Sequence, residues 1–325
     1  MLRLLRQEVI PMHPDILKRQ LLVPAPSLPS LPLPSPREVH FWYVVPDEVK
    51  DASLLKQYME ILSPCERESI LQMDKDKVQR GAVLARTLVR TTLSRYTNYT
   101  SSPSALKFRK NQFGKPELEW KSDDHSVLPS LHFNISHSSS LIACGVTMDV
   151  PIGIDVEEKR RKMRNSVISF ARRFFSPAEV EFLHTFSDPE SQRKEFIKLW
   201  TLKEAYVKAL GRGFSAAPFR DFTVRFEASE TEQVSDNLEI APRICVQVSD
   251  TSESLTSNWR FSLFEADDSH YAAVCVERDN NITGRAFDPL RIKVWKTIPL
   301  VEDERILEKS RDLISVDRPV DCPDL

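Results

Sequence analysis

Residues 196–211, with the sequence FIKLWTLKEAYVKALG, predict a helix around which the rest of the chain is organised. The apolar residues of this stretch recur every three or four positions, which is the period of one buried helix face: Phe196, Leu199, Leu202, Tyr206 and Leu210. Gly211 follows the last apolar turn directly and is a typical C-terminal stop for a helix.

Two charged residues of this helix, Glu204 and Lys208, lie one turn apart on the side opposite Leu202 and Tyr206. In isolation such a pair is either a surface ion pair worth about 0.3–0.5 kcal/mol or part of a functional site. Acidic residues and a histidine further upstream favour the second interpretation.

The upstream acids lie on a predicted strand at 151–157, PIGIDVE, whose residues alternate strictly in polarity. Because side chains alternate between the faces of a strand, Asp155 and Glu157 share one face with Gly153. Two carboxylates on one face repel each other unless a cation lies between them, and Mg²⁺ commonly binds one or two carboxylates together with substrate phosphates. The alternative is a pair of solvated acids at a strand end.

The composition limits the class of protein. The chain has 325 residues, of which 28% are charged and 41% hydrophobic, with a net charge of −2. These values are typical of a globular protein and give no general reason to expect a nucleic-acid or membrane partner. No apolar run reaches the roughly 18 residues of a membrane span. Five scattered cysteines without a CxxC pair indicate a reducing compartment, and neither a GxGxxG motif nor a P-loop is present.

The first 36 residues differ from the rest of the chain. Six prolines between positions 24 and 36 predict a linker that packs as neither helix nor sheet. The basic residues before them suggest either a transit peptide, and hence the mitochondrial matrix, or a cytosolic extension. We expect loss of this segment to leave the catalytic machinery intact.

Two stretches carry clustered positive charge. A predicted helix at 77–96 contains five cations without an acid, which favours an anion site there. Basic residues at 159–164, followed by Arg172, Phe174 and Phe175, suggest either a docking surface for an acidic protein or an ordinary solvated surface.

A weak internal repeat predicts the architecture. In each half a long helix is followed by a glycine turn and by strands, with a Ser-His pair at 136–137 and again at 269–270. We therefore expect an α+β fold of two pseudo-symmetric halves, each a mostly antiparallel sheet on a long helix, with the active site at their interface. The halves are assigned to 37–150 and 151–278, and the tail at 279–325 has no predicted structure.

Several of these stretches together resemble the motifs of 4'-phosphopantetheinyl transferases, specifically the surfactin-synthetase-activating type with two halves in one chain. The matching stretches, in chain order, are FGKPEL at 113–118, FNISHS at 133–138, IGIDVE at 152–157, RFFSPAE at 173–179 and WTLKEAYVK at 200–208. The resemblance covers roughly residues 39–278 and implies Mg²⁺-dependent transfer of phosphopantetheine from coenzyme A to a carrier-protein serine, releasing adenosine 3',5'-bisphosphate.

The resemblance also implies roles for individual residues. Asp155, Glu157 and Glu204 would bind Mg²⁺, Glu204 would accept the serine proton, and Lys208 would stabilise the leaving group, with Asp155 counted among the catalytic residues. The coenzyme would be bound by residues from both halves: Lys77, Arg80, Arg86, Lys110, Lys115, Ser136, His137, Lys203 and Lys208. The partner would be an acidic acyl carrier protein or carrier domain, and a chain that contains both halves predicts a monomer.

Two other interpretations remain. The E-x-K at 157–159 occurs in some Mg²⁺-dependent nucleases, although such sites usually place the aspartate on a different element and need a basic stripe that suits a duplex. A catalytically inactive homologue that binds coenzyme A or a carrier protein is the main alternative. The sequence does not identify the carrier, which is a fatty-acid carrier, a nonribosomal or polyketide domain, or an aminoadipate reductase.

Overall fold

The computed structural model describes residues 28–97, 101–119, 130–163, 166–213, 218–227, 243–248, 259–277 and 290–309. The basic segment before residue 28 and Arg164 of the basic cluster lie outside these ranges. In the described ranges no helix is long and apolar enough to cross a membrane.

The first half contains helices and strands up to residue 148: β1 Glu38–Val44, η1 Pro46–Glu48, α2 Ala52–Ile61, α3 Pro64–Leu71, α4 Asp76–Tyr96, η2 Pro103–Ala105, β2 Phe108–Lys110, β3 Pro116–Leu118, β4 Leu131–His137 and β5 Ile142–Met148. The second half and the tail follow: β6 Ile152–Glu158, α5 Val167–Phe174, α6 Pro177–His184, α7 Pro189–Leu210, η3 Phe219–Asp221, β7 Phe222–Glu227, β8 Arg243–Val248, β9 Trp259–Ala266, β10 His270–Glu277, β11 Arg291–Ile298 and β12 Glu302–Lys309.

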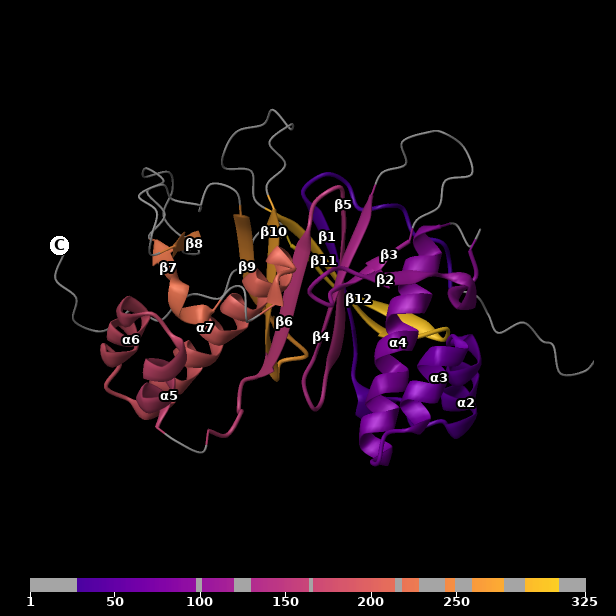
Figure 1. The fold of residues 1–325 in the computed structure, drawn as a ribbon, viewed down its shortest axis with the longest axis horizontal. Coiled ribbons are helices and arrows are strands. Elements are labelled where there is room, and N and C mark those ends of the chain that lie inside the picture. The colour runs from indigo at the N-terminus through magenta and orange to yellow at the C-terminus, as the bar shows by residue number, and fades with distance from the viewer. Residues whose placement is uncertain are drawn as a thin grey trace, which may run out of the picture.

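The molecule has two central sheets with helices on the outer sides (Figure 1). One sheet has the strand order β12-β11-β1-β5-β4 and the other β6-β10-β9. Helix α4 packs on the first sheet and α7 on the second, while residues from both sheets form a shared apolar core between them. The expected α+β fold of two halves, each with a sheet on a long helix, is confirmed.

Side-chain hydrogen bonds define the starts of three helices. Ser63 and Ser176 each form a capping box with the glutamate three residues later, at the starts of α3 and α6. Helix α7 begins at Pro189, earlier than the predicted Phe196, because the Asp188 side chain accepts a hydrogen bond from the Ser191 N–H at 2.8 Å and caps the helix there.

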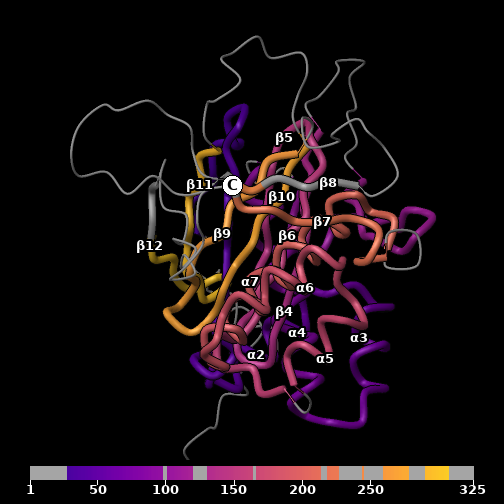
Figure 2. The backbone as a smooth tube through the Cα atoms, turned by 90° about the vertical axis from the view of Figure 1, so that its left-hand side faces the viewer, coloured from indigo at the N-terminus to yellow at the C-terminus, as the bar shows by residue number. Residues whose placement is uncertain are grey.

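The tail, for which no structure was predicted, completes the sheet of the first half. Strand β11 pairs in parallel with β1, and β12 pairs antiparallel with β11 at the edge of the sheet (Figure 2). Trp295 of β11 stacks on Trp42 of β1, with ring centroids 4.3 Å apart.

Candidate active site

Strand β6 presents the expected alternation. Ile152, Ile154 and Val156 are buried in the core between the two sheets. The opposite face lies against α7, and a Cβ atom built on Gly153 would stand 2.0 Å from the Ala205 carbonyl oxygen. Only glycine permits this approach, so Gly153 brings the acidic face of β6 onto α7.

Helix α7 is buried along most of its C-terminal half, but Trp200, Glu204 and Lys208 are half-buried. These three residues are spaced four apart, so they form one stripe along the helix. Lys208 donates hydrogen bonds from its Nζ atom to Asp155 Oδ1 at 2.8 Å and to Ser136 Oγ at 2.9 Å. The stripe and the acidic face of β6 therefore form one polar cluster, which we call the acidic cluster: Asp155, Glu157 and Glu204, with Lys208 and Ser136.

Ser136 connects the two halves at this cluster. It lies near the end of β4 in the first half and donates a hydrogen bond to Asp155 Oδ1 at 2.8 Å. Its hydroxyl also accepts the Val156 backbone N–H, and the neighbouring Asn134 side chain accepts the Ile154 N–H. Side-chain hydrogen bonds thus hold β4 beside β6, and the site is built from both halves.

The carboxylates of the cluster affect one another electrostatically. Burial is the main cause that raises the pKa of Glu204 to about 8, and the charge of Asp155 adds to it. Burial and Asp155 likewise raise the pKa of Glu157 to about 6. Closely spaced, partly desolvated carboxylates of this kind gain from a nearby cation.

The structure supplies two such cations from the chain itself. Lys208 pairs with Asp155, and Arg161 pairs with Glu157 at 2.7 Å. As the side chains lie here, the described ranges hold no group of three acidic, histidine or cysteine residues close enough to bind a metal ion. However, Asp155 is only 5% exposed, and its Oδ2 atom is buried without a hydrogen-bond partner among the described atoms.

The expected coenzyme-binding residues lie in different parts of the structure. Ser136 and Lys208 belong to the acidic cluster, and His137 is exposed at the end of β4. Hydrogen bonds from Ser139 and Ser140 are the larger causes that lower the pKa of Glu158 at the end of β6, and the charge of exposed Lys77 adds to them. For Arg86 and Lys110, the described side chains show no hydrogen bond or ion pair to the acidic cluster.

Lys115 lines a separate cavity of about 240 Å³ beside the C-terminal end of α7. Its amine donates to the Ile152 carbonyl oxygen at 2.8 Å, and burial lowers its pKa to about 8. The adjacent Asn111 side chain donates to the Gly211 carbonyl oxygen, which fixes the β2–β3 hairpin against the end of α7. The hairpin is therefore held next to the helix that carries Glu204 and Lys208.

Lys203, expected among the coenzyme-binding residues, lies outside the acidic cluster. It is completely buried and donates to both Glu179 carboxylate oxygens, at 2.6 and 2.8 Å, and to the Phe222 carbonyl oxygen. A helix turns by about 100° per residue, so the residue before Glu204 points into the core instead of the cluster. In the sequence Glu179 appears only as the last residue of the RFFSPAE motif, and its ion pair with Lys203 was not predicted.

The contacts of three other residues bear on the expectations from the sequence. Arg80 donates from its Nη2 atom to the backbone carbonyls of Pro46 and Val49 and so helps to hold the chain after β1. Phe175, expected on the docking surface, is 1% exposed and stacks on Phe196 in the core. Arg161, from the same basic stretch, pairs with Glu157, and the spacing of four residues was the available signal for this pair.

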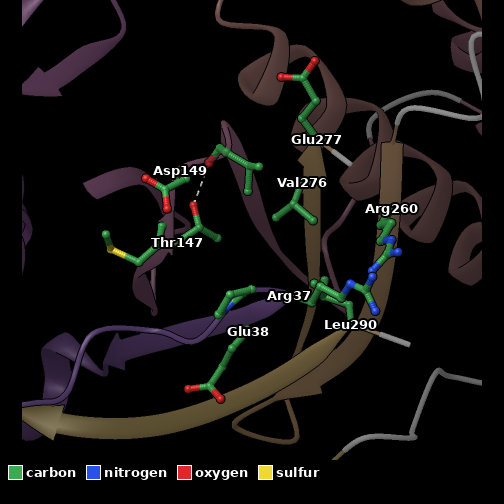
Figure 3. A pocket seen from close by; sticks show the side chains of 11 residues that line it. Arg37, Glu38, Thr147, Asp149, Arg260, Val276, Glu277 and Leu290 are labelled. Carbon is green, nitrogen blue, oxygen red and sulfur yellow. Dashed lines mark hydrogen bonds between the residues drawn. The ribbon is translucent and has the colours of Figure 1, made fainter. Parts of the chain in front are cut away.

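A second cavity, of about 70 Å³, lies away from the acidic cluster at the junction of β5, β9, β10 and the start of β11 (Figure 3). Charged residues from both halves line it, including Arg37, Asp149 and Glu277. The Thr147 hydroxyl donates to the Val150 carbonyl oxygen at 2.9 Å and so closes the turn into β6. None of the expected site residues lines this cavity.

Comparison with known proteins agrees with this geometry. Residues 151–275 match the 4'-phosphopantetheinyl transferase superfamily, and residues 50–147 match the 4'-phosphopantetheinyl transferase N-terminal family. Relatives include 4'-phosphopantetheinyl transferase HetI of a Nostoc species, 35% identical over 58% of this chain and 75% of its own length. Others are 4'-phosphopantetheinyl transferase Sfp of Bacillus subtilis, 33% identical over 52% of this chain and 69% of its own, and a second Bacillus subtilis 4'-phosphopantetheinyl transferase, 38% identical over 43% and 55%.

The aligned segment thus spans between about half and three quarters of the length of these relatives. The two family matches together cover both halves of the described fold, including the β6 and α7 residues of the acidic cluster. The chain belongs to the 4'-phosphopantetheinyl transferase superfamily.

Proposed function

We propose that this chain transfers 4'-phosphopantetheine from coenzyme A to a serine hydroxyl of an apo carrier protein. The observation that carries the proposal is the buried Asp155, which meets Lys208 and Ser136 on one oxygen and has its other oxygen unpaired beside Glu157 and Glu204. Binding a carrier or coenzyme A alone gives no reason to maintain such a costly group of carboxylates.

The acidic cluster fits a magnesium ion in its chemistry. Its donors are carboxylate oxygens, which Mg²⁺ prefers, and the buried Oδ2 atom of Asp155 lacks a partner among the described atoms. Asp155, Glu157 and Glu204 would hold the ion, with Glu157 released from Arg161. When bound, Mg²⁺ supplies positive charge against the coenzyme pyrophosphate.

The residues of the chain then account for the transfer. Glu204 accepts the proton of the carrier serine as the serine Oγ forms a bond to the β-phosphorus of coenzyme A. The bond from that phosphorus to the bridging oxygen breaks, and adenosine 3',5'-bisphosphate leaves. Lys208, fixed by Asp155 and Ser136, places its positive charge where the leaving phosphate gains negative charge.

The surface around α5 supports an acidic carrier as the partner. Arg160 and Arg172 are exposed, and Phe174 is partly exposed beside Trp200 at 5.9 Å between ring centroids. A basic rim around an apolar centre increases the rate at which an acidic partner associates. Reversal of charge in Arg160→Glu and Arg172→Glu is expected to raise the KM for the carrier and to leave the KM for coenzyme A unchanged. If the KM for the carrier and the KM for coenzyme A rise equally, this surface is not the docking site for the carrier.

The reaction is tested by the intact mass of an apo acyl carrier protein after incubation with the purified chain, coenzyme A and Mg²⁺. We expect the carrier to gain the mass of one phosphopantetheine, and the gain to disappear with a chelator or in Glu204→Gln. If several unrelated carriers gain no mass while coenzyme A still binds, the chain is a catalytically inactive homologue. If coenzyme A does not bind either, the proposed function is wrong.

A further inference from the structure

Arg161 lies between the acidic cluster and two aromatic residues that contact each other, Phe174 of α5 and Trp200 of α7. Its Nη1 atom donates to Glu157 Oε1 at 2.7 Å, and its guanidinium carbon lies 5.7 Å from the centre of the Trp200 ring. The Arg161 side chain is 45% exposed, whereas that of Glu157 is 18% exposed. Arg161 therefore contacts both the largely buried carboxylate of Glu157 and the ring of Trp200.

The second cation of the acidic cluster is Lys208, whose amine donates to Asp155 Oδ1 at 2.8 Å. The chain thus neutralises its own acids with one cation from α7 and one from the connection between β6 and α5.

The two cations are held very differently. Lys208 extends from a buried helix, and both Asp155 and Ser136 accept hydrogen bonds from its amine. Arg161 lies in the connection after β6, about half exposed, and has Glu157 as its charged partner. A long, half-exposed arginine can leave such a partner by rotating its side chain, because exposed ion pairs contribute little to stability.

A guanidinium paired with a carboxylate competes with a metal ion for the same negative charge, because each cation repels the other. We propose that Arg161 is a displaceable counter-ion, which competes with a divalent cation for Glu157 and moves off the Trp200 face when the cation binds. The inference rests on the proposed function, in which the acidic cluster is the cation site. It assigns Arg161 a positioning role that links metal binding to Trp200 and to Phe174 beside it.

The first test measures Mn²⁺ affinity of the full metal-free chain from the electron paramagnetic resonance signal of free Mn²⁺. Arg161→Gln is expected to bind Mn²⁺ about two- to five-fold more tightly than the parent chain. Arg160→Gln is the matched control, since it removes the same charge from the adjacent exposed position. If the two variants change the affinity equally, the effect is general electrostatics and the inference is wrong.

The second test follows tryptophan fluorescence during titration with Mg²⁺, which does not quench by itself. We expect a saturable change in the parent chain and in Arg160→Gln, and its loss in Arg161→Gln and in Trp200→Phe. A change that persists in Arg161→Gln would show that Trp200 does not sense this residue and would overturn the coupling.

Asp155→Asn separates this inference from the proposed function. If the parent chain binds no Mn²⁺, or if binding survives Asp155→Asn unchanged, the metal site itself is wrong and the inference fails with it. If Mn²⁺ binding is lost in Asp155→Asn but the Mn²⁺ affinity of Arg161→Gln equals that of the parent chain, only the inference fails. Urea unfolding of Asp155→Asn and Arg161→Gln, compared with that of the parent chain, checks that both variants fold.

Discussion

Lys208 of α7 and Asp155 of β6 are joined by a hydrogen-bonded ion pair of 2.8 Å, although 53 residues separate them in sequence. The pair exists because Gly153 lets the strand approach the helix backbone and because Ser136 of the other half bonds to both partners. The cluster therefore depends on the packing of three elements, and changes at each of them have distinct consequences.

Lys208→Met is expected to lower kcat for carrier modification about 100- to 1,000-fold, since it removes one fixed positive charge from the leaving phosphate. Turnover of coenzyme A with a saturating apo carrier measures the effect. The thermal unfolding temperature of the variant provides the control for folding. A folded variant with the parent kcat would show that Lys208 has no part in the transfer.

Gly153→Ala is expected to destabilise the fold by about 1–3 kcal/mol, because the added methyl group meets backbone atoms of α7 that cannot move aside. Gly81→Ala in α4 is the matched control. A Cβ atom there meets nothing within 4 Å, and alanine in a helix is favoured over glycine by about 0.5–1 kcal/mol. The urea midpoint of unfolding should therefore fall in Gly153→Ala and rise in Gly81→Ala. An unchanged midpoint in Gly153→Ala would contradict the close approach of β6 and α7.

Lys203→Met is expected to cost about 3–5 kcal/mol of stability, because Glu179 would remain charged while 1% exposed. Adding Glu179→Gln should recover part of this loss, since the amide oxygen can still accept the Val224 N–H, which now bonds to Glu179 at 2.7 Å. Urea unfolding of the single and double variants measures the coupling.

The same variant tests whether Lys203 has any role in binding. The KM for coenzyme A of folded Lys203→Met is expected to equal that of the parent chain, because the amine is enclosed by Glu179 and the Phe222 carbonyl. A stable variant with a raised KM for coenzyme A would place Lys203 at the substrate after all.

The stability of the chain should depend on His40 in acid. This side chain is 1% exposed, bonded to Tyr96 and Glu38, and burial is the main cause that lowers its pKa to about 4. The unfolded chain takes up this proton near pH 6.5, whereas the folded chain does so only near pH 4. Stability is therefore lost as the pH falls from about 6.5 to about 4, by up to about 1.4 kcal/mol per pH unit.

Urea unfolding of His40→Gln between pH 7 and pH 4 measures this dependence. The variant is expected to be less stable at pH 7, where it loses the contacts of the imidazole, but to show a shallower decline in acid. His184→Gln, at an exposed position, should keep the slope of the parent chain. An unchanged slope in His40→Gln would mean that another group takes up the proton.

The main features of the fold were predictable from local patterns. The alternation of residues 152–157 predicted β6 and its acidic face, and the apolar period of residues 196–211 predicted the C-terminal part of α7. These signals are short-range, because both periods arise from the geometry of a single strand or helix. The resemblance of the motifs then named the family correctly.

Position along a motif was less informative about single side chains. Lys203 and Glu204 are adjacent, yet one is enclosed in the core and the other belongs to the acidic cluster. A lysine is rarely buried unless it is paired, and its partner Glu179 lies on another helix. The burial of Lys203 was therefore decided by tertiary packing.

The sequence by itself determined the central helix, strand β6, the family and the composition of the acidic cluster, because periodic apolar residues and short motifs act within each element. Only the tertiary structure decided that β11 and β12 complete the first sheet, that Arg161 pairs with Glu157 and that Ser136 joins the halves. The reason is physical: strand pairing and side-chain contacts across the molecule depend on which surfaces meet on folding, and no local period specifies that choice.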